Sequence, residues 1–293
     1  MSRGILIKAL LYLFAFLPLP VSHAIGALAG TCLAYLPVRV RTITQTNIDL
    51  CLPELSAAQR RKLVKACLRE TGKTVVETGA LWLRSGASSL RLIRRVDGIE
   101  HVEMAQAKGQ GIILATPHLG AWEAAGLYCA ARYDITCLYR PLRMPELEDL
   151  VRNARGRAGG NYVPTTAQGI RTLYRTLGEN RAVAMLPDQE PQSGTGIFAP
   201  FFGTPAYTML FLSRLSIKTG APIVFVWSER LSYGRGFHLH FRPAIAEACD
   251  EDIETSVAAI NRTVENMIRE CPAQYQWSYR RFRTRPKGEP PIY

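Results

Sequence analysis

The sequence predicts an α/β fold in which a largely parallel central sheet is flanked by helices, with an N-terminal membrane-associated apolar helix or helical hairpin. Short apolar runs, such as residues 111–116 and 222–227, have the composition of strands that are buried on both faces. They alternate with segments of helical periodicity, which is the order that builds a parallel sheet. Residues 9–38, which contain no Asp, Glu, Lys or Arg, form an apolar stretch longer than a core helix needs.

The apolar stretch 9–38 leaves several interpretations open. A cleavable signal peptide is one, although its apolar region is usually about 7–15 residues long. A straight transmembrane helix needs about 20 apolar residues, and Pro18 and Pro20 interrupt this run after a basic N-terminus. Two short helices, 5–17 and 21–36, therefore compete with one kinked span and with a hairpin buried in the core. In the first two cases the segment contacts a bilayer.

The sequence pattern predicts alternating helices and strands in the rest of the chain. Ser56 can cap a helix in which apolar residues recur at near-helical spacing. The predicted helices cover residues 56–84, 122–131, 145–157, 167–177, 207–219 and 253–269. The predicted strands cover residues 111–116, 135–139, 161–163, 182–186, 222–227 and 237–241, the last as an antiparallel partner of the one before it. We expect residues 1–40 to anchor the chain and residues 41–293 to form one catalytic domain.

The formal net charge of +12 indicates an acidic partner: nucleic acid, anionic lipid or an acidic protein. Most basic residues are dispersed and are not gathered with aromatic residues on one element, which disfavours nucleic acid. The tail 279–287 carries five basic residues and no acidic one, so we expect a solvated, irregular end. None of the seven cysteines forms a C-x-x-C pair, so reduced and mostly buried thiols are expected.

The sharpest local feature is residues 116–123, which follow a predicted strand and open a predicted helix. Ligands of open α/β sheets bind beyond the carboxyl ends of the strands. His118 is a natural general base for a hydroxyl, and Glu123 could accept a hydrogen bond from its second ring nitrogen. On spacing alone, Glu123 could equally be a helix-dipole partner and His118 an ordinary loop histidine.

Metal chemistry has little support in the sequence. There is no H-E-x-x-H, Walker A or G-x-S-x-G motif. His238 and His240 lie two apart on a predicted strand and so point the same way. Because no third ligand is evident, we interpret them as structural, and no metal or cofactor is expected.

At these residues the sequence resembles the glycerolipid-type acyltransferases, whose first motif is H-x4-[D/E]. It resembles more closely one branch, the late acyltransferases of lipid A biosynthesis, which add secondary acyl chains in Gram-negative bacteria. The resemblance runs from about residue 10 to residue 241. Besides ATPHLGAWE, the matching motifs are NIDLCLPELS at 47–56, LYRP at 138–141, LPDQ at 186–189 and FAPFFG at 198–203.

The resemblance implies a role for each matching residue. His118 would deprotonate the hydroxyl of an acceptor 3-hydroxyacyl chain, Glu123 would orient His118, and the alkoxide would attack an activated thioester without a cofactor. Arg140 and Arg155 would hold phosphate or the oxyanion, a role that suits a forked guanidinium. The other expected substrate-binding residues are Arg157, Asp188, which could also cap its loop, and Gln189.

The resemblance also implies partners. The acyl donor would be acyl carrier protein, which is acidic, and the acceptor a phosphorylated lipid A precursor. The protein would sit at the inner membrane with its catalytic domain on the cytoplasmic face, and no nucleic acid would bind. Two other readings stay open: an acyltransferase for another lipid acceptor (lyso-phospholipid, ornithine lipid or glycolipid), and a membrane-anchored scaffold that kept the fold without the activity.

Overall fold

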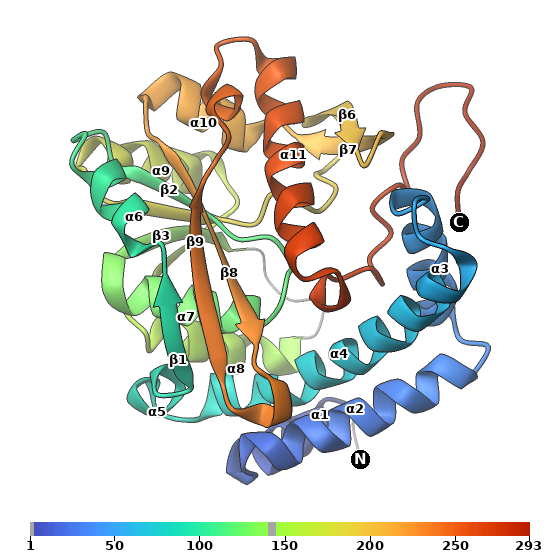
Figure 1. Ribbon diagram of the computed structural model, residues 1–293. Coiled ribbons are helices and arrows are strands. Elements are labelled where there is room, and N and C mark those ends of the chain that lie inside the picture. Colours follow the sequence, from blue (N-terminus) through green and yellow to red (C-terminus); the bar gives the residue numbers. More distant parts are fainter. Residues whose placement is uncertain (1–2, 140–144) are drawn as a thin grey trace.

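The computed structural model describes residues 3–139 and 145–293, which form a seven-stranded sheet with helices on both faces (Figure 1). Arg140, which the sequence places in the site, lies outside the described residues. The strand order is β1-β9-β8-β2-β5-β3-β4. The strands are β1 (Ile93–Asp97), β2 (Ile112–Ala115), β3 (Ile135–Tyr139), β4 (Asn161–Pro164), β5 (Ala182–Met185), β8 (Ile223–Arg230) and β9 (Phe237–Pro243).

The sheet is largely parallel, as predicted. Strands β8, β2, β5, β3 and β4 run in one direction, whereas β9 pairs antiparallel with β8, and β1 pairs parallel with β9. Ala115 at the end of β2 is in register with Met185 at the end of β5. The carboxyl ends of β2 and β5 therefore meet at one edge, where the loops that follow them can share a site.

Helices cover the sheet on both faces because side chains alternate along each buried strand. Ile112 and Leu114 of β2 pack toward α6 and α7, whereas Ile113 and Ala115 pack toward α9, α10 and α11. The helices after the N-terminal region are α5 (Gly86–Leu90), α6 (Ile99–Gln106), α7 (Trp122–Tyr133), α8 (Pro145–Gly156), α9 (Ala167–Gly178), α10 (Phe211–Thr219) and α11 (Ile253–Glu270).

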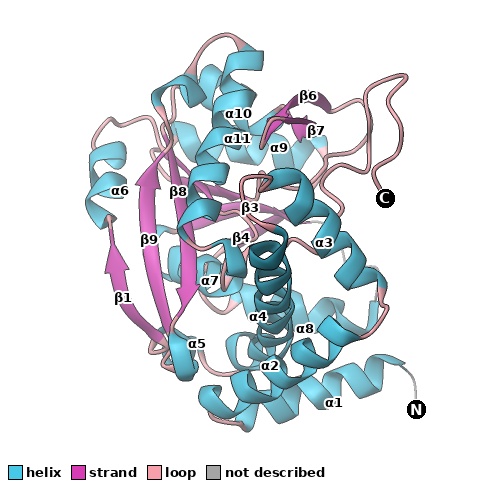
Figure 2. Cartoon of the chain, turned by 45° about the vertical axis from the view of Figure 1, so that its right-hand side comes forward, coloured by secondary structure: helices cyan, strands magenta, loops and turns pink. Residues whose placement is uncertain are grey.

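The N-terminal region is a set of helices that lie at one end of the molecule, away from α10 (Figures 1 and 2). The apolar stretch folds as two helices that separate at Pro18, α1 (Arg3–Phe16) and α2 (Leu19–Tyr35), followed by α3 (Arg39–Cys51) and α4 (Ala57–Leu83). Ser56 and Gln59 form a capping box at the start of α4. A Cβ on Gly30 would lie 2.1 Å from the Leu68 carbonyl oxygen, so glycine permits the close packing of α2 on α4.

By length and composition, none of the described helices could cross a bilayer alone. The pair α2 and α3 meets those criteria together, with a bend of 81° between the two helices. The division of the chain at residue 40 stays a prediction.

Two predictions about the C-terminal half are wrong. The predicted helix 207–219 begins only at Phe211, because the residues before it form a hairpin of β6 (Gly196–Phe201) and β7 (Thr204–Met209). Phe202 and Gly203 both have positive φ at its turn. The basic tail is irregular but not simply solvated: Arg281 is 3% exposed and donates to the Tyr207 carbonyl oxygen and the Thr208 hydroxyl, which fastens the tail to the hairpin.

Candidate active site

The loop between β2 and α7 is held rigidly from both sides. Gln276 N donates to the carbonyl oxygen of His118, and Gly120 N donates to that of Gln274. On the other side, Ala121 N donates to the carbonyl oxygen of Ser228 on β8. Gly120 has φ +64°, and a Cβ there would lie 1.9 Å from the Ser228 oxygen, so only glycine fits. This clamp fixes the backbone from which the His118 side chain projects.

The ring partner of His118 is Asp188, which follows β5. His118 Nδ1 donates to Asp188 Oδ1 at 2.8 Å, and His118 N donates to Asp188 Oδ2 at 2.9 Å. Asp188 is 2% exposed. Burial alone would raise the pKa of Asp188, but the charge and hydrogen bonds of His118 outweigh it and hold that pKa below its ordinary value. The carboxylate thus stays ionised and keeps the His118 ring in one orientation and one tautomer.

The other ring nitrogen, His118 Nε2, is the one that can accept a proton. Gln189 Nε2 lies 3.2 Å from it and donates at 3.0 Å to Gln276 Oε1. An amide N–H can only donate, so this contact fits a lone pair on Nε2 and a proton on Nδ1. Trp122 packs against the ring with centroids 5.1 Å apart.

Glu123 bonds to Trp82 and Arg155, and the ring of His118 bonds to Asp188 in place of the expected Glu123. Its Oε1 accepts from Arg155 Nη2 at 2.6 Å, and its Oε2 accepts from Trp82 Nε1 at 2.9 Å. Burial alone would raise the pKa of Glu123, but the Arg155 charge outweighs burial and lowers it. Glu123 sits in the first turn of α7, so its carboxylate points toward α8 and the end of α4 instead of back along the loop.

Arg157 lies outside this site, contrary to expectation. It is exposed, donates to the Trp82 carbonyl oxygen and lines a separate hollow with Lys8 and Tyr12 of α1. Arg155 lies in the last turn of α8 and Arg157 directly after the helix, and the two side chains line different hollows. Of the two, only Arg155 shares a cavity wall with His118.

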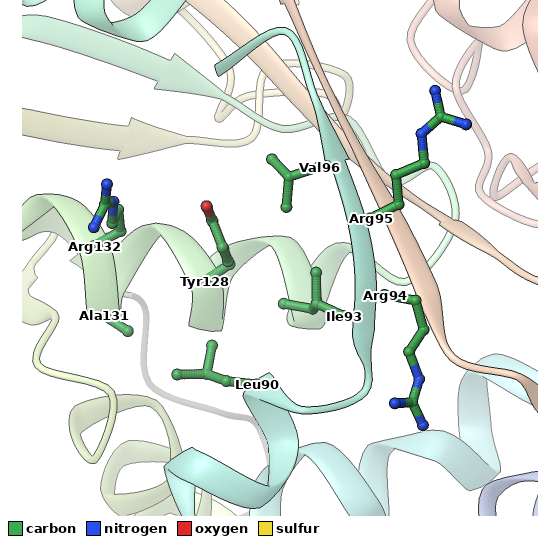
Figure 3. Close-up of a pocket in the computed structure, with 8 residues that line it drawn as sticks. All are labelled: Leu90, Ile93, Arg94, Arg95, Val96, Tyr128, Ala131 and Arg132. Atoms are coloured by element: carbon green, nitrogen blue, oxygen red, sulfur yellow. The ribbon is translucent and has the colours of Figure 1, made fainter. Parts of the chain in front are cut away.

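A cavity of about 630 Å³ lies beside His118, Glu123 and Arg155. Most of its wall is apolar, so it suits a long hydrocarbon chain. Its large apolar lining residues are Trp122, Leu127, Ile135, Leu138, Ile170, Met185, Leu186, Met209, Leu210 and Phe211. A smaller hollow of about 340 Å³ between β1 and α7 shares no lining residue with it (Figure 3).

Sequence reasoning missed two residues of the site. Trp82 lies at the end of α4 and donates to Glu123, and Gln276 lies near the C-terminus and accepts from Gln189. Neither belongs to a recognisable motif, and both reach the site across long sequence separations. A half-buried tryptophan at a helix end carries no signal by itself.

The fold and the site define an α/β protein in which a histidine bonded to a buried carboxylate lies beside a largely apolar cavity. The family model of the bacterial lipid A biosynthesis acyltransferases matches residues 3–284. The lipid A biosynthesis palmitoleoyltransferase of Escherichia coli (strain K12) is 30% identical over 287 residues, covering 97% of this chain and 92% of that protein. The lauroyltransferase of the same organism is 30% identical over 284 residues, with the same coverage.

The chain therefore belongs to the bacterial lipid A biosynthesis acyltransferases, as its motifs indicated. A phosphatidylinositol mannoside acyltransferase of Mycobacterium tuberculosis (strain ATCC 25618 / H37Rv) is also similar, at 27% identity over 184 residues, 60% of this chain and 56% of that protein. Membership of the family implies acyl transfer with a lipid A acceptor.

Proposed function

We propose that this protein transfers a fatty acyl chain from acyl carrier protein to a hydroxyl of a phosphorylated lipid A precursor. The observation that carries the proposal is the bonded pair His118–Asp188 beside an apolar cavity of about 630 Å³. The net charge of +12 favours both substrates, because acyl carrier protein and lipid A precursors are acidic.

His118 is the proposed general base. Asp188 holds the proton of the ring on Nδ1, which leaves the lone pair of Nε2 directed at the acceptor. The acceptor hydroxyl takes the place of the Gln189 amide at Nε2, and Gln189 keeps its bond to Gln276. General-base assistance of this kind contributes about 10²–10⁴ to a rate.

The proposed reaction exchanges a thioester for an ester. His118 Nε2 takes the hydroxyl proton as the oxygen attacks the thioester carbonyl carbon. The tetrahedral intermediate then expels the thiolate by breaking the carbon–sulfur bond, and the thiolate receives the proton from Nε2. Arg155 lies in the same wall and provides positive charge near the developing oxyanion, although Glu123 neutralises part of that charge.

The N-terminal helices are the proposed membrane contact. Exposed large apolar side chains are concentrated on α1 and α2, including Leu13 and Phe16, and Phe16 is 84% exposed. Such side chains favour burial among lipid tails, and Lys8, Arg39 and Arg41 nearby favour anionic headgroups. The catalytic domain is proposed to lie at the cytoplasmic face of the inner membrane, because the thioester donor is cytoplasmic.

A second candidate function is acyl transfer to another lipid acceptor. The similarity to a phosphatidylinositol mannoside acyltransferase supports it, because that relative acts on a glycolipid outside lipid A. The base and the cavity would serve either acceptor, since both offer a hydroxyl and accept a long chain.

An acyl-transfer assay in detergent tests the proposal. Purified protein is given radiolabelled acyl–acyl carrier protein with one acceptor at a time, and the acylated product is measured. The acceptors are a phosphorylated lipid A precursor, a lyso-phospholipid, an ornithine lipid and a mannosylated phosphoinositide. We expect product on the lipid A precursor. Product on one of the others alone would move the protein to the second function. An acyl-coenzyme A donor that outperforms acyl carrier protein would overturn the donor assignment.

Replacing Gly126 by leucine is expected to shorten the acyl chain that the enzyme prefers. Gly126 lies within α7 and lines the cavity, and a Cβ there meets nothing within 4 Å, so the new side chain can enter the cavity without clashing with the wall. The leucine side chain fills the space of about three methylene groups of the acyl chain, and burial of each methylene group contributes about 0.8 kcal/mol. We therefore expect kcat/KM for the longest accepted chain to fall about tenfold or more. A competition assay with acyl donors of graded chain length measures this change in preference.

Gly178→Leu is the matched control, because Gly178 ends α9, is exposed and does not line the cavity. An unchanged chain-length profile in Gly126→Leu would show that the acyl chain lies elsewhere.

A further inference from the structure

Asp97, His238 and His240 gather at the side of the sheet formed by β1 and β9, although the two histidines had no evident third ligand in the sequence. One ligand atom from each of these three residues lies within 4.8 Å of those of the other two. Asp97 of β1 comes into register with His240 of β9, and His238 Nε2 lies 2.9 Å from Asp97 Oδ2. The parallel pairing of β1 with β9, which the sequence did not predict, creates this group.

A fourth candidate ligand, a second carboxylate, is close. Glu229 of β8 stands opposite His238 in the antiparallel register, and its Oε2 lies 3.2 Å from His240 Nε2 and 3.9 Å from His238 Nδ1. Two imidazoles and two carboxylates from three adjacent strands thus lie in one cluster, with Asp97 next to Nε2 of the His238 ring and Glu229 nearer its Nδ1. This ligand set suits Zn²⁺, which is bound by nitrogen and carboxylate oxygen at about 2.0–2.2 Å in a tetrahedral arrangement.

The two histidine rings are buried and lie against each other. His238 and His240 are each nine-tenths buried, and their ring centroids lie 3.8 Å apart. Trp227 stacks on His240 at 4.3 Å, which fixes that ring. His240 Nδ1 is buried and has no hydrogen-bond partner among the described residues.

The group is separate from the acyl-transfer site. Figure 3 shows Ile93 and Val96 pointing from β1 toward α7 and Arg95 pointing away from it. Asp97 bonds to Arg95 Nε at 2.8 Å, so it shares that opposite face. None of Asp97, Glu229 and the two histidines lines the cavity beside His118.

We propose that Asp97, His238 and His240, with Glu229 beside them, bind one divalent transition-metal ion, for which Zn²⁺ is the best match. The ion would join the edge strand β1 to β9 and β8 and so stabilise that edge of the sheet. An ordinary ion-pair cluster would contain the same contacts, but it would not bind a metal with a fixed stoichiometry. The proposal does not depend on the acceptor or on the donor of the acyl-transfer reaction.

The test is calorimetric titration of Zn²⁺ into metal-free full-length protein, purified in detergent with a tag that contains no histidine. Cys32 and Cys249 are exposed and are replaced by serine in every sample, since free thiols also bind Zn²⁺. We expect one ion per chain and a Tm that rises with Zn²⁺ concentration. Added Co²⁺ should also quench the fluorescence of Trp227, because Trp227 stacks on a ligand.

The variants His238→Gln, His240→Gln and Asp97→Asn keep hydrogen-bonding groups and remove one ligand each. We expect each to weaken Zn²⁺ binding at least about tenfold, since loss even of a residue behind a ligand costs about that much. His101→Gln, a histidine outside the group, is the control and should bind like the parent. Agreement of the three variants with the parent, or the absence of stoichiometric binding in the parent, would overturn the proposal. If a histidine variant fails to fold, Zn²⁺ binding by Asp97→Asn compared with the parent still tests the proposal.

Discussion

Replacing Asp188 by asparagine is expected to lower kcat for acyl transfer about a thousandfold while leaving the fold and the KM for the acyl donor nearly unchanged. Asp188 accepts two hydrogen bonds, one from the backbone N–H of His118 and one from its Nδ1. Asparagine offers one oxygen and one NH₂. The backbone N–H can only donate, so it takes the oxygen and leaves the NH₂ facing Nδ1. The ring proton then moves to Nε2, which can no longer accept the proton of the acceptor hydroxyl.

Steady-state kinetics with acyl–acyl carrier protein measures this effect as a fall in kcat. Glu190→Gln is the matched control, because it removes a carboxylate two residues along the same loop that bonds to Thr284 and Arg283 but not to His118. We expect Glu190→Gln to keep most of the activity. Equal losses in the two variants would mean that Asp188 acts only through the structure of the loop.

Replacing Glu77 by alanine is expected to cost about 3–5 kcal/mol of unfolding free energy, because it leaves the buried Arg230 charge with only the more distant Glu70, 3.6 Å away, as an ionic partner. Glu77 and Arg230 are 2% and 4% exposed, and Glu77 Oε1 accepts from Arg230 Nη2 at 2.7 Å. The same Nη2 donates to the Gly120 carbonyl oxygen, and His23 of α2 bonds to Glu77 at 2.9 Å. The pair therefore joins the N-terminal helices to the loop that carries His118.

Chemical unfolding in detergent measures this loss. Glu54→Ala is the control, since its ion pair with Arg269 is equally short, at 2.8 Å, but about half exposed, and such pairs contribute about 0–1 kcal/mol. A loss for Glu77→Ala no larger than that for Glu54→Ala would contradict the assignment.

The stability that Glu77 provides should depend on pH. Burial opposes its ionisation, but Arg230 and His23 outweigh burial and lower the pKa of Glu77 in the folded state. A carboxylate with a lowered folded-state pKa contributes its full stability above the unfolded pKa of about 4.3, and loses it as the pH falls through the folded value. The stability difference between the parent and Glu77→Gln should therefore shrink below about pH 4.3.

The sequence predicted the elements whose signal is local. The strand 135–139 was placed at its observed bounds, and the helix 167–177 within one residue, because each is a periodic run between breaking residues. The strand β1 was missed because IRRVD, with two exposed arginines, lacks an apolar run. The hairpin β6–β7 was missed because its aromatic motif was interpreted as a loop followed by a helix.

The site was predicted less completely than the fold. His118 was found from its motif, but its partner was sought within the next helical turn. The partner, Asp188, lies 70 positions away and reaches His118 only because β2 and β5 are adjacent in the sheet. Spacing along one loop carries no information about strand order. Asp97 and the two histidines were not brought together for the same reason.

The most direct test of the central claim, that His118 is the base of an acyl transfer, is a single-turnover assay with radiolabelled acyl–acyl carrier protein and a phosphorylated lipid A precursor. Parent protein, His118→Ala and the control His101→Ala are compared at equal concentration. We expect acylated product with the parent and the control, and at least about a hundredfold slower transfer with His118→Ala. Transfer by His118→Ala at the rate of the parent would contradict it.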